Sequence, residues 1–128
     1  MDGGPAAEPT VLAVLPDTQF YSCGYPQIFQ QQTQWIAAHA RSRGIAATIH
    51  TGDIVDSDVD LQWRVAADSM HALGRLPYTL TAGNHDLSAQ RASLLPNYFP
   101  VSELERFQEG WGTYEPLRLD NSYAVVQV

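Results

Sequence analysis

The amino-acid sequence predicts an α/β domain with a largely parallel sheet and helices packed on it. Three short apolar runs alternate with two stretches of helical periodicity, in the order strand, helix, strand, helix, strand, and the connections are compact. This alternation is typical of βαβ units, in which successive strands run parallel. Hydrophobic residues make up 45% of the 128 residues and charged residues 16%, which indicates a globular chain able to bury a core.

The first half of the pattern begins with a nearly continuous apolar run at residues 11–16, as expected for a strand covered on both faces. A loop containing Gly24 and Pro26 follows. A helix is predicted after this loop because apolar residues recur at i, i+7 and i+8, on one helical face, and because Gly44 offers a stop. The apolar residues on this face are Ile28, Trp35 and Ile36.

The second half repeats the pattern, with a strand predicted at residues 45–50. Ser57 is the expected N-cap of the second helix, and Asp60 follows three residues later in a capping-box arrangement. From Val59 to Gly74 the apolar residues keep helical phase; they are Val59, Trp63, Ala66, Ala67, Met70 and Leu73. Residues 78–83 are expected to form the third strand.

The two ends of the chain are less regular. Residues 1–9 are interpreted as a flexible leader and residues 10–128 as the folded part. Between residues 87 and 121 the periodicity dissolves into Pro, Gly and aromatic residues, and a segment this long and irregular is either functional or poorly placed. Within it only residues 102–109 are typical of a short helix. Residues 122–128 are expected to form a last strand, which would be an apolar strand left uncovered at the edge of a sheet.

Composition excludes several classes of function. The net charge is −7, with seven Arg as the only basic residues besides His, which argues against nucleic acid or a membrane as the main partner. The single cysteine, Cys23, allows neither an internal disulfide nor a zinc site made of cysteines. The first residues lack the features of a signal peptide, and no apolar run approaches the 18 or so residues of a membrane span. The sequence predicts a soluble chain, cytoplasmic by default.

Polar clusters follow all three predicted strands: PDTQ the first, TGDIVD the second and AGNHD the third. Because the carboxyl ends of parallel strands lie on one edge of a sheet, where ligands bind, these side chains are expected to converge. Turn or capping roles explain any one cluster alone. Three clusters at successive strand ends, one with adjacent His and Asp, indicate a site. Its candidate residues are Asp17, Gln19, Asp53, Asp56, Asn84, His85 and Asp86.

The residue types in these clusters suit divalent metal ions. Carboxylates, amide oxygens and imidazole favour borderline-hard cations, and the lack of Cys ligands removes the soft option. Asp53 follows the strand expected at the centre and is the natural carboxylate to bridge two cations. His85 could donate to a phosphate oxygen or protonate a leaving group, with Asp86 orienting its ring. Gly52 and Gly83 lack a Cβ, so backbone can pass close to the metals there.

Together, PDTQ, GDIVD and GNHD resemble the first three motif blocks of the calcineurin-like metallophosphoesterase family, over nearly the whole chain from Val11. The stretches QW, NYFP and NSY resemble its bacterial branch. The resemblance implies the N-terminal half of an αββα sandwich and a binuclear centre of two divalent ions, Mn, Fe, Zn or Mg, that hydrolyses phosphoesters. It also implies metal binding by Asp17 and Asn84, bridging by Asp53, leaving-group assistance by His85 and a supporting position for Asp56.

Two departures from the family pattern affect the site. Gln19 stands where the family most often has a His; its neutral oxygen cannot titrate, and we favour a position at or near a metal. A further His and a Gly-His-x-His block, which complete the family's ligands, are absent. The other histidines do not replace them, because His39 and His71 lie within predicted helices and His50 is expected to pack inside a strand.

These observations favour a metal-dependent phosphoesterase represented by its N-terminal half, with weak metal binding and little or no turnover. The alternative is a non-catalytic metal- or partner-binding module of the same ancestry. A flavodoxin-like nucleotide or phosphate binder is a third reading, but it would have a Gly-rich or Ser/Thr-rich loop where this chain has PDTQFYS. The kind of phosphoester (monoester, diester, nucleotide or phosphoprotein), the metal and the oligomeric state stay open.

Overall fold

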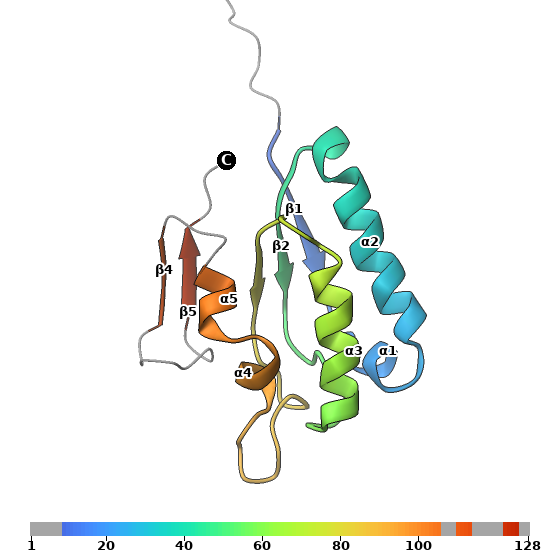
Figure 1. The fold of residues 1–128 in the computed structure, drawn as a ribbon, viewed down its shortest axis with the longest axis vertical. Coiled ribbons are helices and arrows are strands. Elements are labelled where there is room, and N and C mark those ends of the chain that lie inside the picture. The colour runs from blue at the N-terminus through green and yellow to red at the C-terminus, as the bar shows by residue number, and fades with distance from the viewer. Residues whose placement is uncertain (1–8, 106–109, 114–121, 126–128) are drawn as a thin grey trace, which may run out of the picture.

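The central sheet consists of the parallel strands β1 (Val11–Leu15), β2 (Ile45–His50) and β3 (Tyr78–Leu80) (Figure 1). The structure is a computed structural model and describes residues 9–105, 110–113 and 122–125. All three predicted strands are present, but the third ends at Leu80 and not at residue 83, and the first ends one residue early at Leu15. The α/β class with a parallel sheet is therefore confirmed.

The strand order is β1–β2–β3, which makes β2 the central strand, as expected. Leu15 pairs with His50, and His50 pairs with Leu80, so the three strands end at the same level. The polar clusters that follow them begin on one edge of the sheet. This edge lies near helix α1 (Gln19–Gly24), toward the bottom of Figure 1. Sequence periodicity did not predict α1, which occupies much of the expected loop around Gly24.

Helices α2 (Pro26–Arg43) and α3 (Asp60–His71) lie side by side on one face of the sheet (Figure 1). Right-handed crossovers that step in the same direction place their helices on the same face. The expectation that the first strand is covered on both faces is therefore wrong. Leu15 points into the core and is 3% exposed, whereas Leu12 and Val14 are 53% and 57% exposed.

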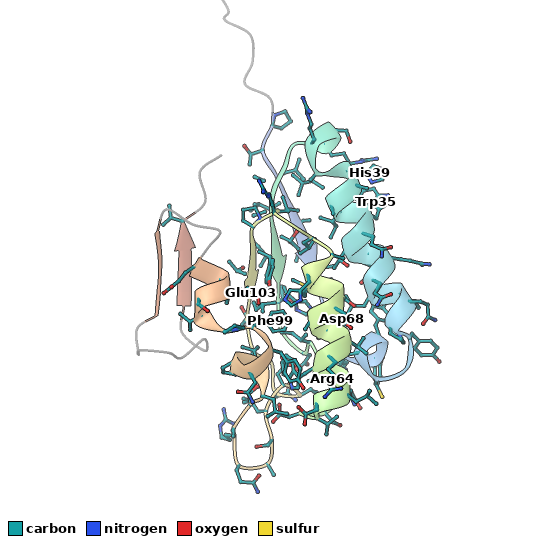
Figure 2. All side chains as sticks on the ribbon, viewed as in Figure 1. Trp35, His39, Arg64, Asp68, Phe99 and Glu103 are labelled. Atoms are coloured by element: carbon teal, nitrogen blue, oxygen red, sulfur yellow. The ribbon has the colours of Figure 1, made fainter. Side chains whose placement is uncertain are left out.

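The core lies between the sheet and these two helices. Phe29 of α2 and Trp63 of α3 are fully buried. Phe99 follows the short helix α4 (Leu95–Tyr98) and meets the rings of Trp63 and Tyr78 edge-on, which closes the core beside β3 (Figure 2). Aromatic pairs in this geometry stabilise a fold beyond the area that they bury.

Helix α2 turns a different face to the core from the one expected. Its buried residues are Phe29, Thr33 and Ile36, whereas Trp35 is 48% exposed. The Trp35 ring stacks on His39, with ring centroids 4.4 Å apart, and Arg43 lies over it (Figure 2). The predicted stop is confirmed: Gly44 adopts the left-handed conformation, with φ of 64°.

Helix α3 begins at Asp60, with Val59 as its N-cap residue, and no side chain caps it. The predicted capping box of Ser57 and Asp60 is therefore wrong. The side chain of Gln62 reaches back instead, and its Oε1 accepts hydrogen bonds from the backbone N–H groups of Asp56 and Ser57. Apart from the exposed Val59, the apolar residues predicted to keep helical phase are buried: Trp63, Ala66, Ala67, Met70 and Leu73.

The C-terminal part contains helix α5 (Val101–Glu105) and a hairpin of strands β4 (Gly110–Thr113) and β5 (Ser122–Val125). The helix predicted over residues 102–109 is confirmed up to Glu105, and the last strand up to Val125. Their remaining residues, like residues 1–8 of the leader, lie outside the described residues. Strand β4 was not predicted, and the hairpin forms a sheet of its own (Figure 1). In the described ranges no helix is long and apolar enough to cross a membrane.

Candidate functional site

The three loops that follow the parallel strands are joined by hydrogen bonds. The backbone N–H of Thr18 donates to the backbone carbonyl of Asp53 at 3.1 Å, which links the first loop to the second. The backbone N–H of His85 donates to Asp53 Oδ1 at 3.0 Å, which links the third loop to the second. Asp53 therefore lies between its two neighbours in space although they are 35 and 32 positions away in sequence. The three loops therefore meet at this edge, and convergence of all seven candidate side chains stays a prediction.

The backbone at Asp53 is held in an unusual conformation, with φ of 48°. This left-handed region is uncommon for a residue with a side chain, although Asp and Asn adopt it more readily than others. Such backbone tends to be kept at functional sites, where the surrounding structure compensates for its cost.

Two glycines allow the second and third loops to touch. A Cβ on Gly83 would lie 2.2 Å from Asp53 Oδ1, and a Cβ on Gly52 would lie 2.8 Å from the Gly83 nitrogen. Both distances are far below van der Waals contact. At these glycines the backbone lies close to the Asp53 carboxylate and to the neighbouring loop, and its predicted approach to metals stays a prediction.

Asp86 is fully buried beneath these loops. Its Oδ1 accepts from the Val55 N–H at 2.9 Å and its Oδ2 from the Gly83 N–H at 2.8 Å. Burial raises the pKa of Asp86, while these hydrogen bonds oppose the shift. The carboxylate thus ties the second loop to the third. The prediction that Asp86 orients the His85 ring is wrong, because the Asp86 carboxylate instead accepts from the backbone of Val55 and Gly83.

The His85 ring is oriented by Asp56 instead. Its Nδ1 lies 2.9 Å from the backbone carbonyl of Asp56 and 3.7 Å from Asp56 Oδ1. A carbonyl can only accept, so Nδ1 carries a proton and Nε2 is left for other partners. This hydrogen bond raises the pKa of His85, and the charges of Asp53, Asp56 and Asp17 raise it further, while partial desolvation lowers it. The supporting position expected for Asp56 agrees with this contact.

The remaining candidates are Asp17, Gln19 and Asn84. Asp17 and Asn84 are exposed at the site edge. Gln19 begins α1, and its buried Oε1 has no hydrogen-bond partner among the described residues. A buried amide oxygen without a partner is unusual, and a cation at this edge would supply the missing one.

The residues present fit part of a metal site. In the described part of the chain, no group of three or more His, Cys, Asp or Glu side chains is placed to hold a metal ion. The oxygen donors at the edge are Asp17, Gln19, Asp53 and Asn84, and such a set suits hard or borderline divalent ions. Their roles as ligands stay predictions.

Thr18 and Asp58 organise the site although the sequence did not predict a role for either. Thr18 lies between two candidate ligands, yet it is 1% exposed and faces inward. Asp58 Oδ1 accepts hydrogen bonds from Trp63 Nε1 at 2.7 Å and from the Leu94 N–H at 2.8 Å, which anchors the third loop's continuation to α3. The only sequence signal for either was its position beside a motif, because each has a partner more than 30 residues away, His50 for Thr18 and Leu94 for Asp58.

The other histidines lie where the sequence placed them. His39 stacks on Trp35 on the outer side of α2 (Figure 2). His71 ends α3, and its Nε2 lies 2.6 Å from Glu103 Oε1 of α5. His50 is fully buried in β2, as expected for a packed residue, with its ring near Phe29.

Comparisons with known proteins agree with this geometry. The family model described as calcineurin-like phosphoesterase matches residues 10–126. The uncharacterized protein YvnB of Bacillus subtilis (strain 168) is 35% identical over 116 residues, which are 87% of this chain and 9% of that protein. This chain thus spans about a tenth of the length of that relative. No solved structure gives a significant match. The three strand-end motifs and the family match together show that the chain belongs to the calcineurin-like phosphoesterase family.

Proposed function

We propose that the protein carrying this chain hydrolyses phosphoesters with divalent metal ions held at the carboxyl edge of the parallel sheet. The observation that carries the proposal is the convergence of the three loops on Asp53, which accepts the His85 N–H through its side chain and the Thr18 N–H through its backbone. Membership of the calcineurin-like phosphoesterase family supports this kind of reaction.

The metal ligands on this chain would be Asp17, Gln19, Asp53 and Asn84. Asp53 follows the central strand and has candidate ligands on both sides, which suits a bridging carboxylate in a binuclear centre. When bound, divalent ions polarise the phosphoryl oxygens and neutralise the charge that develops during displacement. Mn, Fe, Zn and Mg are all compatible with oxygen ligands.

His85 is placed to hold a proton for the leaving group. Its Nδ1–H is engaged by the carbonyl of Asp56, which fixes the ring and leaves Nε2 as the atom that exchanges a proton with substrate. The hydrogen bond to the Asp56 carbonyl, and after it the surrounding acidic side chains, raise the pKa of His85 and so favour the protonated form. Protonating the leaving oxygen lets it depart as an alcohol.

The ligand set on the described residues is incomplete, which favours weak metal binding and slow turnover by the 128-residue chain alone. The absence of any group of three His, Cys, Asp or Glu side chains placed for a metal in the described ranges supports this. It also supports the second candidate function, a non-catalytic module that binds metal or a partner at the same edge. Turnover separates the two.

The test combines binding with turnover. Mn²⁺ binding to the full chain is measured by calorimetry, and release of nitrophenol from a chromogenic phosphomonoester and phosphodiester is followed with Mn²⁺ present. Mn²⁺ binding that Asp53→Asn weakens supports the site, and Mn²⁺-dependent turnover lost in the same variant supports the enzyme. Asp68→Asn is the control, because it removes the same charge from an exposed position on α3 (Figure 2). Binding without turnover in any longer form of the protein would favour the non-catalytic module.

A further inference from the structure

The buried imidazole of His50 lies directly under the candidate site. His50 ends the central strand β2, is fully buried, and is three residues before Asp53. Burying a polar ring in a core is costly unless each of its nitrogen atoms finds a hydrogen-bond partner. Both nitrogens of His50 have one, and both partners belong to the loops that carry candidate ligands.

The hydrogen bonds around His50 have one consistent direction. The backbone N–H of Gly52 donates to His50 Nδ1 at 3.2 Å, so Nδ1 is unprotonated and the ring proton is on Nε2. Nε2–H then donates to Thr18 Oγ1 at 2.9 Å, and the Thr18 hydroxyl donates onward to the Ile54 carbonyl at 3.0 Å. Every donor in this relay has an acceptor. The neutral ring with its proton on Nε2 is the form that satisfies all three bonds.

The relay joins the first loop to the second from below. Thr18 stands between Asp17 and Gln19, and its side chain is held by His50 and Ile54, one on each side of Asp53 in the sequence. Ser22 of α1 adds a 2.7 Å hydrogen bond to the same Ile54 carbonyl. The backbone bond from Thr18 to Asp53 lies between these contacts. Buried side chains and this backbone bond therefore together hold the loop of Asp17 against the loop of Asp53.

We propose that His50 is a positioning residue for the metal site, which acts through Thr18 to hold the loop of Asp17 and Gln19 against the loop of Asp53. This inference rests on the proposed function for the metal, but the loop-holding role can be measured without it. Replacing a residue that orients a metal ligand without touching the metal itself commonly lowers metal affinity by roughly tenfold or more.

Burial also keeps the His50 ring in the required form. Desolvation lowers its pKa to about 4, so the ring is neutral throughout the neutral pH range. A protonated ring would carry a proton on Nδ1 and oppose the Gly52 N–H, which would break the relay.

The experiment compares three threonine variants of the full chain. Thr18→Val removes the bridging hydroxyl but keeps the shape, and Thr18→Ser restores the hydroxyl. Thr48→Val is the matched control, because Thr48 is equally buried in β2 and its Oγ1 has no hydrogen-bond partner among the described residues. Two quantities are measured: hydrogen exchange of the residue-18 amide relative to the core amide of Met70, and Mn²⁺ affinity by calorimetry.

In Thr18→Val we expect the residue-18 amide to exchange about tenfold faster relative to the Met70 amide. We expect Mn²⁺ to bind about tenfold more weakly. Both changes are the size expected from the loss of one or two hydrogen bonds. Thr18→Ser and Thr48→Val should stay within about twofold of wild type in both. A general loss of stability would speed both amides together. Equal effects of Thr18→Val and Thr48→Val would overturn the inference.

The wild-type chain supplies a second, independent measurement. Nitrogen-15 NMR of His50 should show the neutral ring with its proton on Nε2 at pH 7; a proton on Nδ1 would overturn the relay even if Thr18→Val fails to fold. Wild-type protein that binds no Mn²⁺ would contradict the proposed function, and amide exchange and the ring proton would still decide the role of His50.

Discussion

Asp53 Oδ1 occupies the space into which a side chain on Gly83 would project: a Cβ there would lie 2.2 Å from this oxygen and 2.4 Å from the Asp53 nitrogen. The contact joins the loops after the central and third strands at the carboxylate proposed to bridge the metals. It makes the position of that carboxylate depend on a glycine 30 residues away.

Replacing Gly83 by alanine should therefore displace Asp53. We expect Gly83→Ala to lower the free energy of unfolding by about 1–3 kcal/mol, as for overpacking, and to weaken Mn²⁺ binding at least about tenfold. Thermal unfolding and calorimetry measure the two effects. Gly24→Ala is the matched control, because a Cβ on Gly24 meets nothing within 4 Å, and it should be neutral or slightly stabilising. Similar losses in both variants would contradict the contact.

The bridging role of Asp53 predicts an order of effects between two neighbouring carboxylates. Asp53→Asn should lower Mn²⁺ affinity more than Asp56→Asn, because Asp56 holds His85 mainly through its backbone carbonyl, which the substitution keeps. Asn tolerates the left-handed backbone at position 53, so the fold should be retained. Calorimetry giving the reverse order would move the bridging role to Asp56.

Asp86→Asn should weaken the junction of the second and third loops. An amide has one acceptor oxygen, so its NH₂ group must face the N–H of either Val55 or Gly83. An unsatisfied buried group costs about 1–3 kcal/mol, and relief of the buried charge offsets part of this. We expect a net loss in chemical denaturation, compared with no change for the exposed Asp68→Asn. Unchanged stability of Asp86→Asn would count against this junction.

The lowered pKa of His50 predicts how stability depends on pH. An ordinary histidine has its pKa at 6.5 and folded His50 at about 4. Between these values the unfolded chain binds a proton that the folded chain does not, so stability is lost as the pH falls through this window, by about 3 kcal/mol in total. His50→Gln cannot titrate. As the pH is lowered from 7 to 4, the free energy of unfolding of this variant should therefore rise by this amount relative to that of the wild type. If the two proteins lose stability in parallel over this range, the lowered pKa of His50 is refuted.

Gln19→His tests whether this side chain touches a metal. Imidazole is the better ligand for the softer ion, so the substitution should raise Zn²⁺ affinity more than Mn²⁺ affinity. The unpartnered Oε1 of Gln19 supports a place at the metal. Competition titrations with the two ions give the ratio, and an equal effect on both would place Gln19 outside direct contact.

Local sequence pattern determined the three strands, the two long helices and the stop at Gly44. Strand and helix periodicity are properties of neighbouring residues, so they can be recognised without knowledge of the tertiary structure. The same pattern, with the rule that parallel strands end on one edge, predicted that Asp17, Asp53 and His85 would meet. The reason is topological and requires no knowledge of side-chain packing.

Tertiary structure decided which partners the buried and polar groups found. The exposed face of β1 follows from both crossovers running the same way, and Trp35 faces outward because α2 buries Phe29, Thr33 and Ile36. In place of the expected Ser57 cap, Gln62 Oε1 accepts from the backbone N–H groups of Asp56 and Ser57, which precede α3. His50 meets Thr18, and Asp86 meets Val55, across 32 and 31 residues of sequence, and a hydrogen bond depends on the distance and angle between two groups in space.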